Sequence, residues 1–211
     1  MPALDGRNVR PIATPIVSSG HRPERSGPAD TEMMTMTVAD TARLLLAAST
    51  IGVVDVFWFH HHRFKLHRQP SAAAEEAIHL ASYATFIGLG IALLAVDAHG
   101  GGRWLVAGLF AVQLVLTAAD VLLEPSSRAP LGGLPALEYL FHVLVTFGMG
   151  AAAATFMWSL RADTVTPLDG MAKTQVMTSV GFTTALLAIE ATLYLKAVRR
   201  RRQPTAHVAM A

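Results

Sequence analysis

Residues 103–124 read RWLVAGLFAVQLVLTAADVLLE, and after Arg103 the first charged residue in this stretch is Asp120. An α-helix rises about 1.5 Å per residue, so about 20 residues cross a hydrocarbon core that is roughly 30 Å thick. The stretch is therefore long enough and apolar enough to cross a membrane as a helix. Its acidic residues, Asp120 and Glu124, both stand near its C-terminal end.

Four further stretches have the same character, and together they predict an all-α integral membrane protein. We place the five spans at residues 41–62, 74–97, 103–124, 135–160 and 174–196. The intervening segments are short and rich in proline, glycine and serine, as is typical of turns. Short connections make consecutive helices antiparallel, so we expect a five-helix transmembrane bundle with up-and-down connections.

The overall composition supports this class. Hydrophobic residues make up 52% of the chain and charged residues 15%, whereas soluble domains have roughly 25% charged residues. Residues 1–38 have no apolar core and predict a disordered tail; Met33, Met34 and Met36 offer start sites downstream of most of it. We expect the transmembrane domain at 39–197 and a basic cytoplasmic tail at 198–211.

The distribution of lysine and arginine predicts the orientation. Basic residues are concentrated in the first connection, at Arg128 in the third connection, and after the last span, and with five crossings these segments share one side. The positive-inside rule then places the C-terminus in the cytoplasm and the N-terminus outside, across the plasma or inner membrane. The formal net charge of +2 is too small to indicate a nucleic-acid partner.

Most acidic and histidine residues within the spans fall at one membrane face. An up-and-down bundle brings the ends of the first, third and fifth helices to the starts of the second and fourth. The residues placed at this face are Asp55, Glu76, His79, Asp120, Glu124, Glu138, His142 and Glu190. An unpaired charge within a membrane costs about 2.5–3.5 kcal/mol even on the most lenient scale. Carboxylates such as Asp55 therefore require cationic partners.

Residue spacing favours a metal as that partner. Glu76 and His79 are three residues apart and Glu138 and His142 four apart, so each pair projects from one helix face. Two helices with Glu/His pairs and two with carboxylates supply the ligand types of di-iron and di-manganese bundles. The pattern is similar to ferritin-like carboxylate proteins in ligand type and helix order. The Glu138-x-x-x-His142 spacing and the aspartates depart from that family, and we assign no membership.

We therefore predict a site for two metal ions, iron or manganese, with zinc as an alternative. The predicted ligands are Asp55, Glu76, His79, Asp120, Glu124, Glu138 and His142. Additional candidates are His62, which is seven residues from Asp55 and so shares its helix face, together with Glu190 and Arg128. Simpler interpretations suffice for Glu75, as a partner of the helix dipole, and for the other histidines of the 60–62 run, near lipid headgroups.

The chain has no cysteine, which excludes thiolate zinc sites, iron–sulfur clusters and covalently attached haem. The leading hypothesis is a membrane-embedded, dinuclear-metal oxidoreductase that acts on a lipid or other hydrophobic substrate at the cytoplasmic leaflet and takes electrons from a donor. The alternatives are a zinc or manganese lipid hydrolase, then a haem b electron-transfer protein with His79 and His142 as axial ligands, and then a proton-coupled transporter.

Overall fold

The computed structural model describes residues 36–96, 100–161 and 165–202, and every element within these ranges is a helix. Five of the helical segments are long and apolar enough to cross a membrane, as predicted. They are α1 (Val38–Asp55) with its continuation η1 (Val56–Arg63), α2 (Ala73–Leu94), α3 (Gly102–Arg128), α4 (Ala136–Arg161) and α5 (Gly170–Arg202). Residues 1–35 of the predicted N-terminal tail and residues 203–211 of the C-terminal tail lie outside the described residues.

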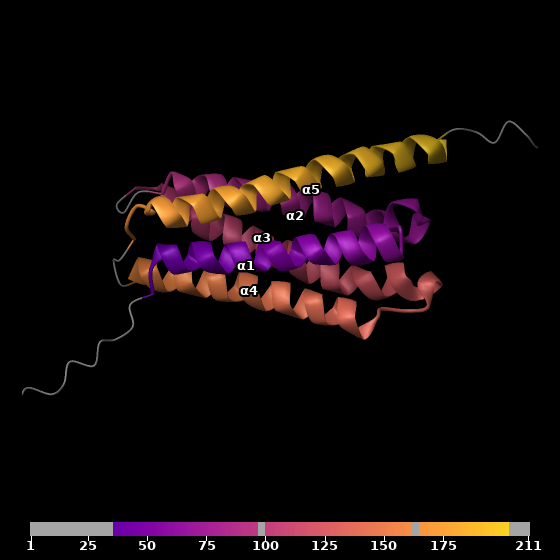
Figure 1. Ribbon diagram of the computed structural model, residues 1–211, viewed down its shortest axis with the longest axis horizontal. Coiled ribbons are helices and arrows are strands. Elements are labelled where there is room, and N and C mark those ends of the chain that lie inside the picture. Colours follow the sequence, from indigo (N-terminus) through magenta and orange to yellow (C-terminus); the bar gives the residue numbers. More distant parts are fainter. Residues whose placement is uncertain (1–35, 97–99, 162–164, 203–211) are drawn as a thin grey trace, which may run out of the picture. The chain divides into compact units, whose positions relative to one another are not determined.

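The five helices form a closed ring of neighbours. Helix α1 packs against α4 and α5, α2 packs against α3 and α5, and α3 also packs against α4 (Figure 1). The end of η1 and the C-terminal ends of α3 and α5 therefore meet the N-terminal ends of α2 and α4. This is the end of the bundle at which the sequence places the ionisable residues.

Small residues allow the closest helix contacts. A β-carbon added at Gly148 of α4 would lie 3.1 Å from the β-carbon of Ala48 on α1, and one added at Gly90 of α2 would collide with Val180 of α5. Large apolar side chains instead cover the outside of the bundle; Leu122 and Phe147, for example, are 79% and 73% exposed. An apolar exterior is what a lipid environment requires.

The third helix runs further than the sequence predicts. We expected it to end at Glu124, before Pro125, but α3 continues through this proline to Arg128. Proline removes one backbone hydrogen bond and usually breaks a helix. Here the last turn is held by side chains: Ser127 Oγ donates to the carbonyl of Glu124 at 3.0 Å, and the buried Arg128 is anchored within the bundle. The longer helix places Arg128 one turn beyond Glu124.

The first span ends in an unusual helix. Residues Val56–Arg63 form η1, a π-helix with i→i+5 hydrogen bonds, such as the bond of 2.9 Å from Phe64 N to Phe59 O. Such bonds fit about one more residue into each turn than an α-helix has. The α-helical register that we assumed beyond Asp55 is therefore wrong.

The connections at this end of the bundle are short helical turns. Lys65 has a φ of 52° and reverses the chain before η2 (Leu66–Arg68) and η3 (Pro70–Ala72), which lead into α2. After α3, the turn η4 (Ala129–Leu131) ends at Gly132 and Gly133, whose φ values of 92° and 93° suit glycine.

Candidate metal centre

The junction of α1 and η1 supplies the first two side chains of the site. Asp55 is the last residue of α1, and His60 lies five residues later in the π-helix. Both are buried, and His60 Nε2 lies 4.0 Å from Asp55 Oδ2. The wider turn of η1 brings these residues to one face, whereas an α-helix would have aligned Asp55 with His62. His62 is instead exposed and lies against the ring of Trp58.

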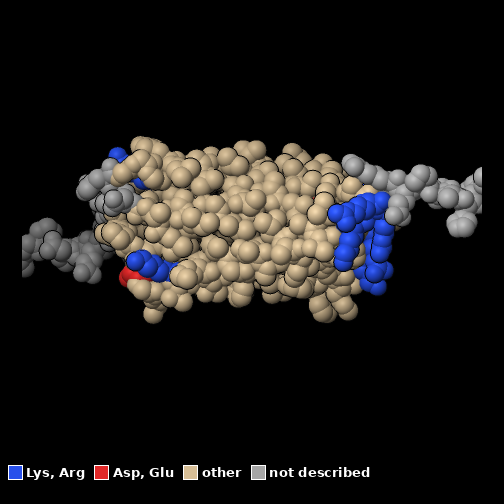
Figure 2. Space-filling model, turned by 90° about the horizontal axis from the view of Figure 1, so that it is seen from above, with Lys and Arg blue, Asp and Glu red and all other residues tan. Residues whose placement is uncertain are grey.

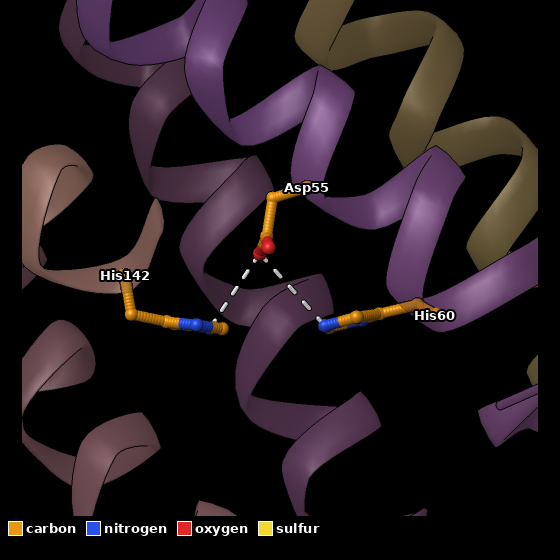
Figure 3. A group of neighbouring side chains, drawn as sticks. All are labelled: Asp55, His60 and His142. Carbon is orange, nitrogen blue, oxygen red and sulfur yellow. Dashed lines mark ion pairs between the residues drawn. The ribbon is translucent and has the colours of Figure 1, made fainter. Parts of the chain in front are cut away.

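Helix α4 places His142 on the other side of Asp55. His142 Nε2 lies 3.6 Å from Asp55 Oδ2, and its Nδ1 lies 3.0 Å from the backbone carbonyl of Glu138. A carbonyl can only accept, so Nδ1 carries the proton and Nε2 has a free lone pair when the ring is neutral. The carboxylate of Asp55 thus points between the imidazoles of His60 and His142 (Figure 3).

Helices α2 and α3 complete the group with a second pair. His79 Nε2 lies 3.0 Å from Asp120 Oδ1, and the other oxygen of Asp120 lies 3.9 Å from His142 Nε2. The ring of His79 stacks on that of His60 with centroids 4.8 Å apart. We call these five residues the histidine–aspartate cluster: Asp55, His60, His79, Asp120 and His142.

The distances suit a shared ion. Two ligands that each lie about 2.0–2.2 Å from one ion are at most about 4.4 Å apart. The separations of Asp55 from His60 and His142, 4.0 and 3.6 Å, fall within this limit. Two groups have ligand atoms that all lie within 4.8 Å of one another: Asp55 with His60 and His142, and His60 with Glu75 and His79. The two groups share His60 and draw on three of the five helices: α1 with η1, α2 and α4.

A second cluster lies around a buried arginine. Arg128 is fully buried; its Nη1 lies 2.7 Å from Glu75 Oε2, and its Nη2 lies 2.5 Å from Glu138 Oε1. Glu124 Oε1 is 3.9 Å from Arg128 Nη2 and 3.3 Å from His142 Nδ1. We call these residues the Arg128 cluster: Glu75, Glu124, Arg128 and Glu138. It joins the other cluster at His60, whose Nε2 lies 3.3 Å from Arg128 Nη2.

The two clusters are layers related by one helical turn. On α2, Glu75 precedes His79 by four residues, and on α4, Glu138 precedes His142 by four. On α3, which runs the opposite way, Glu124 follows Asp120 by four. Four residues of α-helix rise about 6 Å. The Arg128 cluster is therefore the layer nearer the end of the bundle, and the histidine–aspartate cluster is the deeper layer.

The structure pairs His79 with a different glutamate from the one we predicted. Glu75 lies with His79 and Arg128 in the candidate site, whereas no ion pair or hydrogen bond connects the side chain of Glu76 to any described residue. Our simpler interpretation of Glu75, as a partner of the helix dipole alone, is wrong because Arg128 binds it from α3. Both Glu-x-x-x-His pairs then have the same spacing, four residues.

Glu190, another of the predicted candidates, lies on α5. His61 Nε2 is 2.8 Å from Glu190 Oε1, and this pair is separate from both clusters. Of the additional candidates, only Arg128 therefore lies within the candidate site, and it does so as a cation. His60, which we had assigned to a headgroup belt together with His61, belongs to its centre.

Several buried oxygens lack a hydrogen-bond donor among the described residues. They include Asp55 Oδ1, Glu75 Oε1 and Glu138 Oε2. A buried acceptor without a partner costs about 1–3 kcal/mol, and more if it is charged. The two clusters contain five carboxylates but one permanent cation, Arg128. Further positive charge is therefore needed to balance the carboxylates.

A cavity of about 120 Å³ lies against the deeper layer. Asp55, His79, Asp120 and His142 form part of its wall. The rest of the lining is mainly apolar, with Phe86 among its residues, and also includes Gln113. The cavity is comparable to a site for one benzene-sized molecule. A small reactant therefore has room beside the histidine–aspartate cluster inside the bundle.

In comparisons with known proteins, no family model, curated protein or solved structure matches this chain. Function must therefore be argued from the site itself, because a helical bundle alone is compatible with many activities.

Proposed function

We propose that the histidine–aspartate cluster binds metal and that the protein is a membrane-embedded, metal-dependent oxidoreductase. The observation that carries this proposal is the position of the Asp55 carboxylate, buried between the imidazoles of His60 and His142 at distances of 4.0 and 3.6 Å. Three imidazoles and two aspartates suit iron, manganese or zinc. The backbone carbonyl on His142 Nδ1 supports this role, because metal-bound histidines usually donate their second N–H to such an acceptor.

Charge favours a centre with two ions. The five carboxylates of the two clusters and the single guanidinium of Arg128 leave four negative charges when the histidines are neutral. Two divalent cations would balance them. Asp120 and Glu124 lie at the same edge of the site as His142 and supply carboxylates for the second ion.

The cavity supports a hydrophobic substrate. Its volume of about 120 Å³ admits a small molecule or one segment of a longer chain, and its lining is mainly apolar away from the cluster. An iron or manganese pair in this position would activate dioxygen for oxidation of the substrate, with electrons from an external donor. We place the reaction at the cytoplasmic leaflet of the plasma or inner membrane, in keeping with the concentration of basic residues at this end of the bundle (Figure 2).

The geometry gives less support to the other metal and haem hypotheses. The number of carboxylates in the two clusters favours the oxidoreductase slightly over a zinc or manganese hydrolase. A haem b between His79 and His142 needs space for a porphyrin, but His60 stacks on His79 at 4.8 Å and lies 6.3 Å from His142. The cavity beside these rings is benzene-sized.

A proton or cation path is the second candidate, and the polar residues of the cavity favour it. Its wall includes Gln113, whose amide lies 2.5 Å from Ser82 Oγ, and Thr117. These residues extend polarity from Asp120 along α3. Proton or cation flux into proteoliposomes that is present with the wild type and lost with Asp55→Asn would support transport. A metal-loaded protein without flux would support the metal-dependent enzyme.

The direct test is the metal content of the full-length protein purified in mild detergent without chelators. We expect iron or manganese in the wild type and at least about tenfold less in His142→Ala and Asp55→Asn. His62→Ala is the matched control, because His62 is exposed and lies outside the cluster.

Four results would reject parts of the proposal. Absence of metal from the wild type, or equal metal in wild type and both cluster variants, would reject the metal centre. Zinc as the sole metal would reject the oxidoreductase in favour of the hydrolase. A Soret absorption band would identify haem.

A further inference from the structure

A basic pocket lies outside both clusters, beside the C-terminal end of α5. It has a volume of about 550 Å³ and is formed by η2, the start of η3 and the last turns of α5. Its cationic residues are Arg68, Lys196, Arg200 and Arg201. These residues stand where the spans Pro70–Leu94 and Gly170–Arg201 reach one end of the bundle. Figure 2 shows blue side chains gathered at this end.

The cationic side chains of the pocket form no ion pair within the described part of the chain. None of the four cationic side chains lies within ion-pair distance of a described carboxylate. Arg201 Nη2 donates to the backbone carbonyl of Gln69 at 3.0 Å, which holds α5 against the first connection. Arg68 Nε lies 3.3 Å from His67 Nε2. Burial, with His61 and Arg68 nearby, lowers the pKa of His67, so its ring is neutral near pH 7 and accepts from Arg68.

The wall of the pocket also has an apolar part, made of Pro70, Leu193 and Ala197. Leu193 lies deeper in the span than Arg200, so the pocket runs from a charged rim toward the apolar part of the helices. A free anion needs only the rim. An amphiphile with an anionic headgroup uses both parts, since its glycerol and first methylenes contact the apolar wall.

We propose that the basic pocket binds the phosphate headgroup of an anionic membrane lipid. Basic pockets between transmembrane helices at the cytoplasmic face are suited to such headgroups, and each lysine or arginine near an anionic surface strengthens binding by about fivefold. The site is independent of the metal centre, because none of its residues belongs to either cluster. By joining α5 to the connection between η1 and α2, the bound lipid fastens the end of the bundle that carries the clusters.

Lipid retention tests this site. Full-length protein in neutral detergent is titrated with phosphatidylglycerol, phosphatidylcholine or inorganic phosphate, and bound lipid is counted by native mass spectrometry. We expect saturable binding of phosphatidylglycerol, at least about tenfold weaker binding of phosphatidylcholine, and no competition by millimolar inorganic phosphate. Arg68→Gln and Arg200→Gln should each weaken phosphatidylglycerol binding by about fivefold, and the double variant by about 25-fold.

The matched control is Arg199→Gln, which removes the same charge from the same exposed helix end but does not line the pocket. It should change binding by less than about twofold. Equal losses in Arg199→Gln and Arg200→Gln would show diffuse attraction to the basic helix end and overturn the pocket. Competition by inorganic phosphate at the lipid's own affinity would overturn the lipid in favour of a free anion. Unchanged thermal unfolding of the variants shows that any loss of binding is not caused by misfolding.

Discussion

The Arg128 cluster and the histidine–aspartate cluster lie one helical turn apart on the same helices, but they differ in the source of their positive charge. In the first, the cation is part of the chain: Arg128 donates to Glu75 through Nη1 and to Glu138 through Nε and Nη2. In the second, two aspartates face three imidazoles, and none of these rings has a permanent charge. The deeper layer must therefore obtain its cation from outside, as metal ions or protons.

This difference separates a structural role from a chemical one. Removing one partner of a buried ion pair leaves the other charge uncompensated, so Arg128 with Glu75 and Glu138 should determine stability. The deeper layer lies against the cavity, and its ligands should determine metal content with a smaller effect on folding. His60 touches both layers, since its Nε2 lies 3.3 Å from Arg128 Nη2 and 4.0 Å from Asp55 Oδ2.

The largest effect is expected from Arg128→Met, which removes the permanent cation of the Arg128 cluster. The variant buries Glu75 and Glu138 without a counter-charge and should lose about 3–5 kcal/mol of unfolding free energy. Denaturant unfolding of chelator-treated protein in detergent measures this loss. Adding Glu75→Gln and Glu138→Gln to Arg128→Met should recover most of it. A single variant as stable as the wild type would show that Arg128 is not the structural centre.

The next comparison uses two adjacent glutamates. Glu75→Gln weakens a charged hydrogen bond to Arg128 at 2.7 Å and should cost about 1.5–3 kcal/mol. Glu76→Gln removes a buried carboxylate that no described residue contacts by a hydrogen bond or ion pair, and it should leave stability unchanged or raised. The same unfolding experiment measures both. Equal losses would mean that the contact with Arg128 does not make Glu75 more important for stability than Glu76.

These two glutamates also show the limit of sequence reasoning. Helix period places both Glu75 and Glu76 near the face of His79, since residues three or four positions apart are neighbours on a helix. The choice between them depends on Arg128, which reaches α2 only because α3 continues through Pro125. The repeated Glu-x-x-x-His spacing of α2 and α4 was the available sequence signal.

The five spans, by contrast, could be predicted from local composition, because each one is long and apolar by itself. The convergence of Asp55, His79, Asp120 and His142 followed from antiparallel connections. His60 could not be placed in this way, because the π-helix changes the register between Asp55 and the histidine run. Five consecutive ring-bearing residues, 57–61, precede His62 and gave no sign of that change.

A smaller effect is expected when a ligand of the deeper layer loses its charge. Asp55→Asn keeps the size of the side chain, and we expect about tenfold weaker metal binding, equivalent to about 1.4 kcal/mol. The thermal stabilisation produced by added manganese should decrease accordingly. Glu190→Gln is the matched control, because Glu190 is a buried acid at the same end but pairs with His61 outside the clusters. A loss of stabilisation in both variants would argue for general electrostatic attraction.

The smallest effect on metal content is expected from His61→Ala. Comparing this variant with His60→Ala tests whether the two adjacent histidines have different roles. His61 pairs with Glu190 outside the clusters, so its removal should leave the metal content unchanged. His60→Ala removes a ring that lies between Asp55, His79 and Arg128, and it should reduce the metal content at least about tenfold. Metal analysis of the two variants side by side makes the comparison. If His61→Ala lost metal and His60→Ala retained it, the centre would lie toward α5, and both the register of η1 and our assignment of the deeper layer would be wrong.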